Sequence, residues 1–181
     1  ASNELASRID DSKAKILVIA SCGFEPGKTV EYKPLVDGAI KQANHKIDKM
    51  ILFQRSGHEV KLNAPKEVSW DEVVSNAKEI DCVEMKSNEF AYILYTSGTT
   101  GTPKGIVRDI GGHIVALKWT MKNIYNINEG DIWWSASDIG WIVGHSYIVY
   151  APLFKGCTTV LFEGKPVGTP DAGAFWKIIS D

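Results

Sequence analysis

The chain has 181 residues, a typical length for one domain, of which 44% are hydrophobic and 23% charged. Its formal net charge of −2 lacks the basic excess that nucleic-acid binding or attachment to an anionic membrane would need. No run of residues is long and apolar enough for a membrane-spanning helix. We therefore expect neither nucleic acid nor a membrane as a partner.

The three cysteines, Cys22, Cys82 and Cys157, are odd in number, far apart and not arranged as a C-x-x-C pair. This pattern predicts neither a disulfide framework nor a zinc site, and it favours a reducing, intracellular compartment. The histidines form no metal-ligand spacing, so we predict no protein metal site. Residues 1–15 lack the basic start and apolar core of a signal peptide.

The predicted elements alternate between helix and strand. In chain order they are the end of a helix at 4–11, a strand at 15–20, a helix at 34–42, a strand at 49–53, a helix at 69–78, a strand at 92–95, a helix at 111–125, a strand at 132–135, a helix at 141–150, a strand at 158–162 and a helix from 171 onward. This alternation predicts a layered α/β fold with a largely parallel sheet and flanking helices.

Two polar, aperiodic segments, 55–69 and 81–89, are predicted to be loops. They separate a first half, about 1–88, from a second half, 89–181. The last residues, 175–181, stop inside an amphipathic helical pattern without a stop signal. We therefore expect the chain to be a piece of a longer one.

Directly after the first predicted strand, the tripeptide GKT at 27–29 imitates the end of a Walker A loop. The position five residues before Gly27 holds Cys22 rather than the required glycine, and Glu25 and Pro26 stand where a phosphate needs N–H donors. No helix pattern follows. We interpret the segment as a turn and not as a Walker A site.

The stretch YILYTSGTTGTPKGIVR at 92–108 joins an apolar strand to a loop of small, hydroxylated residues. Gly98 and Gly101 have no Cβ, so the backbone around them can turn several N–H groups toward one anion. Lys104 adds a positive charge. Further donors are the hydroxyls of Thr96, Ser97, Thr99 and Thr100. A few charge-assisted hydrogen bonds of roughly 1.5–3 kcal/mol each would hold a polyphosphate, so we predict a phosphate-binding loop.

The spacing of this loop differs from a Walker A motif, because two residues separate the second glycine, Gly101, from Lys104. From Thr96 to Gly105 the chain resembles the adenylate-forming superfamily, whose signature TSGTTG-x-PKG it matches completely. This superfamily includes acyl-CoA synthetases, luciferases and the adenylation domains of peptide synthetases. The resemblance implies that the loop holds the β- and γ-phosphates of ATP and that Lys104 compensates charge on the leaving pyrophosphate.

The segment IWWSASDIGWIVGHSYIVY at 132–150 brings aromatic side chains together with glycines. Its glycines suit a wall that a ligand approaches closely, whereas Trp133, Trp134 and Tyr150 favour a packed aromatic core. His145 has no recognisable nucleophile to activate, so we interpret it as a hydrogen-bonded structural residue. Asp138 is expected to orient the neighbouring turn.

The block SD-x-GW-x-x-GHSY in this segment resembles the short-chain acyl-CoA synthetases, and EGKPVGTPDAG at 163–173 is similar to propionyl-CoA synthetases. The resemblance implies that Trp141 gates and shapes the acyl pocket while Ile142 and Val143 contact the acyl chain. Acetate enzymes carry Val and Thr at the last two places, so the pair Ile-Val makes this wall more apolar. Propionate fits at least as well as acetate, and one methylene is worth only about 1–3 kcal/mol in such a pocket.

The resemblance also implies contacts to coenzyme A. Loops in the first part of short-chain acyl-CoA synthetases approach the nucleotide portion of coenzyme A, so Arg8 and Lys28 are candidates for binding its phosphates. An ordinary surface turn with a solvated Lys28 is an equal alternative.

Together these resemblances imply part of the N-terminal, adenylating domain of a short-chain acyl-CoA ligase. A carboxylate would attack the α-phosphate of ATP, bound with Mg²⁺, and the thiol of coenzyme A would then displace AMP. We expect the adenine-binding motifs and the C-terminal domain beyond Asp181, so the 181 residues alone should be inactive. The expected compartment is the cytoplasm or the mitochondrial matrix, and the sequence does not indicate an oligomeric state.

Two other classes of protein stay open at this point. One is a non-enzymatic module that binds a nucleotide or coenzyme A through the same loop. The other is a conventional P-loop kinase or NTPase, which the spacing of the glycines disfavours.

Overall fold

The structure, a computed structural model, describes residues 1–96, 103–165 and 168–181. The chain divides into two compact units. Unit 1 comprises residues 1–80 and 164–181, and unit 2 comprises residues 81–163.

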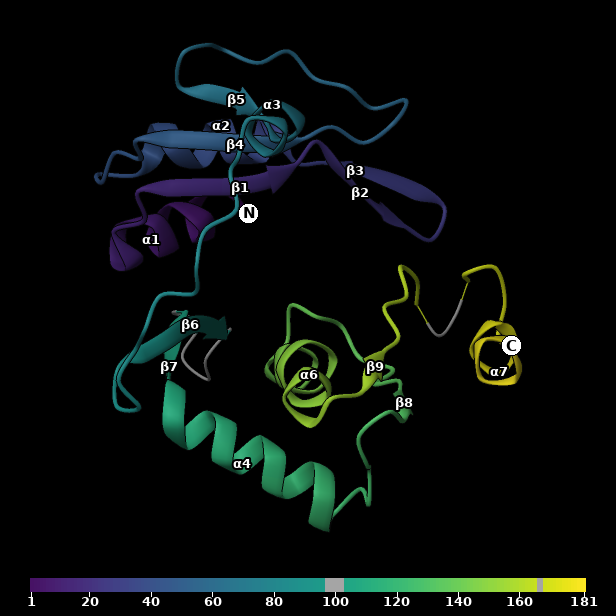
Figure 1. The fold of residues 1–181 in the computed structure, drawn as a ribbon. Helices are drawn as coiled ribbons and strands as arrows, with labels where there is room; N and C mark the ends of the chain where they lie inside the picture. The colour runs from purple at the N-terminus through teal and green to yellow at the C-terminus, as the bar shows by residue number, and fades with distance from the viewer. Residues whose placement is uncertain (97–102, 166–167) are drawn as a thin grey trace. The chain divides into compact units, whose positions relative to one another are not determined.

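Unit 1 is built on a three-stranded parallel sheet with the strand order β1-β4-β5 (Figure 1). Its strands are β1 (Ile16–Ala20), β4 (Lys49–Phe53) and β5 (Glu67–Ser69). On one face of the sheet, Met50 and Leu52 are buried against Val36. Because side chains alternate along a strand, the residues between them, such as Ile51, belong to the opposite face.

Two helices supply the rest of the unit 1 core, namely α1 (Ser2–Ser12) and α2 (Lys33–Gln42). They pack together through Ala6 and Ile9 of α1 and Ala39 of α2, all of them buried. The small alanine side chains let the two helix backbones approach closely. Pro34 occupies the first turn of α2, where its missing N–H costs no hydrogen bond.

The remaining elements of unit 1 are a β-hairpin and two short helices. The hairpin pairs β2 (Cys22–Glu25) with β3 (Lys28–Glu31) in antiparallel register. Gly27 turns the chain between them with φ +74°, a conformation that side chains disfavour. The helices are α3 (Trp70–Ser75), which follows β5 directly, and α7 (Ala174–Ser180).

Unit 2 begins with an antiparallel pair of strands, β6 (Phe90–Thr96) and β7 (Lys104–Asp109). The chain passes from β7 straight into α4 (Ile110–Asn123), as Figure 1 shows. Asp109 caps this helix by accepting a 2.7 Å hydrogen bond from the backbone N–H of Gly112.

The second part of unit 2 winds from a short strand through three consecutive helical segments to another short strand. The strands β8 (Ile132–Trp133) and β9 (Thr158–Thr159) pair in parallel. Between them lie α5 (Ile142–Gly144), the π-helix η1 (His145–Tyr150) and α6 (Ala151–Lys155). The core forms where Leu117 and Met121, one turn apart on α4, meet Ala151 and Cys157.

The predicted α/β class is confirmed, with parallel strands and flanking helices. The strand predicted at 49–53 has the same bounds as β4, and the helix predicted at 34–42 differs from α2 by one residue. The two antiparallel hairpins were not predicted. The helix predicted at 141–150 is helical over nearly its whole length, but most of it is π-helix.

Candidate functional site

The hairpin of β6 and β7 carries both ends of the predicted phosphate-binding loop. Thr96 is the last residue of β6 and pairs directly with Lys104, the first residue of β7. Thr96 is half-buried and Lys104 is exposed. The hydroxyl and the ammonium group are therefore borne by neighbouring backbone positions at one end of a hydrogen-bonded ladder.

Five of the predicted phosphate-binding residues lie outside the described residues. They are Ser97, Gly98, Thr99, Thr100 and Gly101. Their role stays a prediction, as do the roles of Thr96 and Lys104. Gly105 is described, and a Cβ there would stand 2.8 Å from a methyl carbon of Ile93 on β6. The missing side chain at position 105 therefore leaves room for the side chain of Ile93.

The predicted acyl-pocket residues lie at the start of α5. Trp141 is the N-cap residue, and its side chain is 62% exposed. Val143 is 53% exposed, and Ile142 between them is half-buried. The exposed apolar side chains of Trp141 and Val143, on the same turn, are available to a ligand, and their contact with an acyl chain stays a prediction.

The backbone of the turn before α5 lies in close contact with the backbone of α5. Asp138 orients it by accepting a 2.7 Å hydrogen bond from the backbone N–H of Gly140, as expected from the sequence. A Cβ on Gly144 would stand 1.8 Å from the backbone oxygen of Asp138. The chain's own backbone, and not a ligand, therefore requires glycine at position 144.

His145 makes contacts typical of a structural residue, as predicted. Its Nδ1 lies 3.1 Å from the backbone oxygen of Ile139, and its backbone N–H donates to the oxygen of Trp141 over 2.8 Å. Both bonds bracket the turn that presents Trp141.

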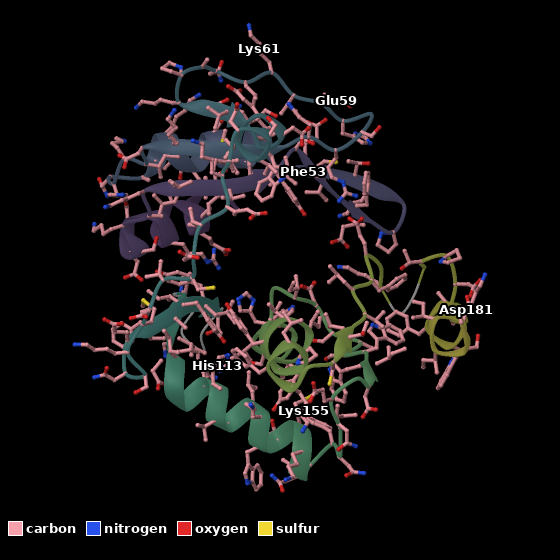
Figure 2. All side chains as sticks on the ribbon, in the orientation of Figure 1. Phe53, Glu59, Lys61, His113, Lys155 and Asp181 are labelled. Carbon is pink, nitrogen blue, oxygen red and sulfur yellow. The ribbon has the colours of Figure 1, made fainter. Side chains whose placement is uncertain are left out.

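A group of rings joins β6, α4 and η1, and we call Tyr92, His113, His145 and Tyr150 the Tyr92 cluster. Tyr92 and Tyr150 stack with ring centroids 5.2 Å apart and planes inclined by 3°. His113, at the beginning of α4 (Figure 2), meets Tyr92 edge-on at 5.3 Å. The Tyr92 hydroxyl oxygen lies 3.2 Å from Nε2 of His113.

Two members of the Tyr92 cluster, His113 and Tyr150, have pKa values shifted toward the neutral form. Burial, and next the positive charge of Arg108, lower the pKa of His113 below its ordinary value of 6.5. Burial and the neighbouring Tyr92 raise the pKa of Tyr150 above 10.0. His113 is 8% exposed, and the lowered pKa keeps its imidazole uncharged at neutral pH, so one ring nitrogen can accept a hydrogen bond from the Tyr92 hydroxyl.

The predicted aromatic core is confirmed for Trp133, whose Nε1 donates a 2.7 Å hydrogen bond to the backbone oxygen of Tyr147. Trp133 also contacts the ring of Tyr125 at 5.0 Å. Trp134 meets Phe162 edge-on at 6.3 Å. Tyr150 belongs to the Tyr92 cluster and stacks on Phe154 as well.

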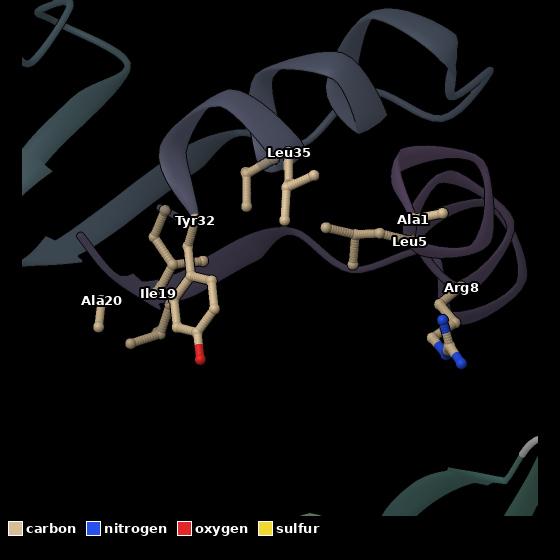
Figure 3. Close-up of a pocket in the computed structure, with 9 residues that line it drawn as sticks. Ala1, Leu5, Arg8, Ile19, Ala20, Tyr32 and Leu35 are labelled. Carbon is tan, nitrogen blue, oxygen red and sulfur yellow. The ribbon is translucent and has the colours of Figure 1, made fainter. Parts of the chain in front are cut away.

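Unit 1 holds the two predicted coenzyme A contacts on different elements. Arg8 lies on α1, 3.7 Å from the carboxylate of Glu4, and lines a pocket of about 440 Å³. The other lining residues are mainly apolar, and Figure 3 shows the guanidinium of Arg8 and the hydroxyl of Tyr32 at opposite ends of them. An apolar pocket with a cation at one end suits an anion that carries an apolar portion.

Lys28 is exposed at the start of β3. It faces Glu25 across the turn at Gly27. The turn lies at Pro26 and Gly27, and residues 28–29 already belong to β3. A hairpin lacks the helix N-terminus that a Walker A loop needs, in agreement with the interpretation that this segment is not a Walker A site. The coenzyme A contacts of Arg8 and Lys28 stay predictions.

Among the residues that the structure describes, no three His, Cys, Asp or Glu side chains stand together as a metal ion would require. The three cysteines are free, and burial raises the pKa of the Cys157 thiol. In the same described ranges, no helix combines the length and apolar character needed to cross a bilayer.

The family model described as "AMP-binding enzyme" matches residues 1–181. The chain belongs to this family of AMP-binding enzymes. Its described fold is also similar to that of the acetoacetyl-CoA synthetase from Streptomyces lividans, with a TM-score of 0.84 at 23% identity over 98% of this chain and 26% of that one. At this identity the likeness concerns the fold alone.

Two curated relatives show which members of the family the chain is similar to. Acyl-CoA synthetase short-chain family member 3, mitochondrial, from Homo sapiens is 53% identical over 182 residues, which cover all of this chain and 26% of the relative. Propionate–CoA ligase from Escherichia coli strain K12 is 42% identical over 181 residues, 99% of this chain and 29% of the relative. The chain thus spans about a quarter of the length of these relatives.

The motifs in the sequence do not indicate that Tyr92, His113 and Tyr150 form one group. Along the chain, His113 is 21 residues from Tyr92 and 37 residues from Tyr150. A sequence signal existed only for Tyr92, which precedes the loop on its strand. Nothing in the spacing predicted that a π-helix would turn two residues of η1 toward it.

Proposed function

We propose that the chain is part of the N-terminal, adenylating domain of a short-chain acyl-CoA synthetase that activates propionate or acetate. The observation that carries the proposal is the pairing of Thr96 with Lys104 at the base of a loop whose sequence is TSGTTGTPKG. The relatives named as an acyl-CoA synthetase and a propionate–CoA ligase support it, because they align along nearly the whole chain. No observation favours a module without chemistry.

In the proposed reaction a carboxylate oxygen attacks the α-phosphorus of ATP, the bond to the bridging oxygen breaks, and pyrophosphate leaves with the electron pair. The thiol of coenzyme A then attacks the acyl carbon of the adenylate and AMP leaves. Lys104 stabilises the negative charge that builds on the pyrophosphate, and Thr96 donates a hydrogen bond to it, together with Ser97, Gly98, Thr99, Thr100 and Gly101. This role is electrostatic and positional.

The other substrates have separate places in the proposal. Trp141 shapes and gates the acyl pocket, and Ile142 and Val143 contact the acyl chain. Arg8 and Lys28 bind phosphates of coenzyme A. Mg²⁺ accompanies ATP and is held mainly through the nucleotide's own phosphates, which agrees with its usual preference for phosphate and water ligands. The enzyme works in the mitochondrial matrix or the cytoplasm, and the human relative's name includes "mitochondrial".

The experiment that tests the proposal is carboxylate-dependent ATP–pyrophosphate exchange in the longer enzyme that contains these residues. Lys104→Ala should lower the exchange rate about 100-fold or more, as loss of a preorganised stabilising group does. Lys118→Ala, on the exposed side of α4, is the matched control and should leave the rate unchanged. An unchanged rate in Lys104→Ala would contradict the role of the loop.

Two further arms of the experiment separate the alternatives. A panel of acetate, propionate and butyrate identifies the carboxylate, and binding of ATP without exchange for any acid would favour the non-enzymatic module. The 181 residues alone should produce no acyl-CoA, and detectable carboxylate-dependent pyrophosphate release from them would contradict the expectation that they are inactive by themselves.

A further inference from the structure

The Tyr92 cluster connects the two parts of unit 2 that the proposed reaction needs. Tyr92 stands on β6, four residues before Thr96. His145 and Tyr150 stand on η1, directly after the α5 turn with the acyl-pocket residues. His113 holds the first turn of α4, which continues β7.

The π-helix is what brings both of its ring residues to Tyr92. In an α-helix, residues five apart point roughly 140° away from each other. The i→i+5 hydrogen bonds of a π-helix instead place residues five apart on about the same face. The rings of His145 and Tyr150 lie 4.9 Å and 5.2 Å from that of Tyr92, so one side of η1 faces β6.

We infer that Tyr92, His113 and Tyr150 are positioning residues, which hold the strand entering the phosphate-binding loop against the segment that carries Trp141, so that carboxylate and α-phosphate meet in line. This inference rests on the proposed function. The cluster touches neither substrate, and it acts through Thr96 on one side and through the turn bonded to His145 on the other. A relative shift of about 1 Å between two bound reactants can lower a rate by about 100-fold.

The hydrogen bond between Tyr92 and His113 is the most directional contact of the cluster. The bond joins β6 to α4, and the ring contact of His113 with Tyr150 at 5.4 Å links it onward to η1. Loss of the bond should therefore shift β6 relative to η1 without removing a substrate contact, and lower kcat while both KM values stay the same. In the tautomer with its proton on Nδ1, the neutral imidazole accepts a hydrogen bond from the Tyr92 O–H at Nε2. Protonation of His113 would remove that acceptor.

The test uses the longer enzyme and the variants Tyr92→Phe, His113→Gln and the two combined. Tyr92→Phe keeps the stacked ring and removes only the hydroxyl. Loss of one buried hydrogen bond predicts a decrease in the adenylation rate of about 3- to 10-fold. Tyr125→Phe is the matched control, because the ring of Tyr125 packs at a tilt against Trp133 in unit 2 and lies outside the cluster.

Rates are measured per active site, from the burst of pyrophosphate, together with KM for ATP and for the carboxylate. The inference expects a lower rate per site with both KM values within twofold, and a double variant no slower than the slower single one. A merely structural role would reduce the number of active sites and leave the rate of each unchanged. That result, or an effect as large in Tyr125→Phe, would overturn the inference.

The pH dependence supplies a second readout. The charged and titratable groups that face His113 are Arg108 and Asp109 from β7, Tyr92 from β6, and His145 and Tyr150 from η1. The rate per site should fall on acidification below pH 6.5, as His113 gains its proton, and His113→Gln should lack that step. A step retained in the variant would contradict the inference, whereas a wild-type enzyme without exchange would instead refute the proposed function.

Discussion

The two units bury different kinds of side chain. The interior of unit 1 is aliphatic, with Val36, Met50 and Leu52 at its centre, and a lysine is its charged exception. The interior of unit 2 also contains many aromatic rings, in the Tyr92 cluster and in the group around Trp133. Aliphatic side chains pack in many arrangements, whereas rings with hydrogen-bonding tips fix orientation as well as volume.

We expect unit 2 to tolerate less change than unit 1, because its ring contacts fix orientation and the turn at Gly144 brings two backbone segments into close contact. Two variant pairs, at glycines and at helix caps, compare the two units directly, and a third tests the charged residue in the interior of unit 1.

The largest effect is expected for Gly144→Ala in unit 2. Its Cβ would stand 1.8 Å from the backbone oxygen of Asp138, and backbone cannot move aside as a side chain can. We expect a loss of stability of about 3 kcal/mol or more, measured by urea unfolding and located by hydrogen exchange. Gly38→Ala in α2 of unit 1 is the comparison, since its Cβ would meet only the side chain of Ser2. Equal effects in the two variants would remove the difference between the units.

A second effect concerns the buried lysine of unit 1. Lys33 is 6% exposed, and its Nζ lies 2.7 Å from Asp37 Oδ2 and 3.1 Å from Glu67 Oε1. Lys33→Met should cost about 2 kcal/mol, less than the roughly 3–5 kcal/mol for breaking a fully buried pair, because Asp37 is 38% exposed. Lys41→Met, on the exposed side of the same helix, should cost almost nothing.

The pH dependence of this effect has a definite sign. Burial opposes the positive charge of Lys33, but its hydrogen bonds to Asp37 and Glu67 outweigh burial and raise the pKa of Lys33 above 10.5. Burial likewise opposes the Glu67 charge, but bonds from Asn63 and Lys33 lower the pKa of Glu67 below 4.5. The stabilisation is therefore lost as pH falls through the folded pKa of Glu67 or rises through that of Lys33. A difference between wild type and Lys33→Met that stays constant into strong acid would contradict the ion pair's contribution.

The sequence predicted the regular parts of the chain well, because periodic apolar residues report directly on burial. The strand at 49–53 and the helix at 34–42 are examples. The hairpin of β6 and β7 was missed since the residues after the loop, Lys104 to Asp109, alternate too weakly to separate strand from helix. The Tyr92 cluster was missed because it depends on tertiary contact and on a π-helix, which local propensity does not encode.

The smallest effect distinguishes two helix caps. Asp109 caps α4 in unit 2 with a 2.7 Å hydrogen bond to the N–H of Gly112, whereas Ser69 occupies the N-cap position of α3 in unit 1 without such a side-chain bond. Asp109→Ala should therefore destabilise its unit by about 1 kcal/mol, and Ser69→Ala by only a few tenths. Asp109→Asn keeps an acceptor oxygen and should recover most of the loss. Hydrogen exchange at the first turn of each helix measures the effect locally, and equal exchange in Asp109→Ala and Ser69→Ala would show that the Asp109 bond does not stabilise α4.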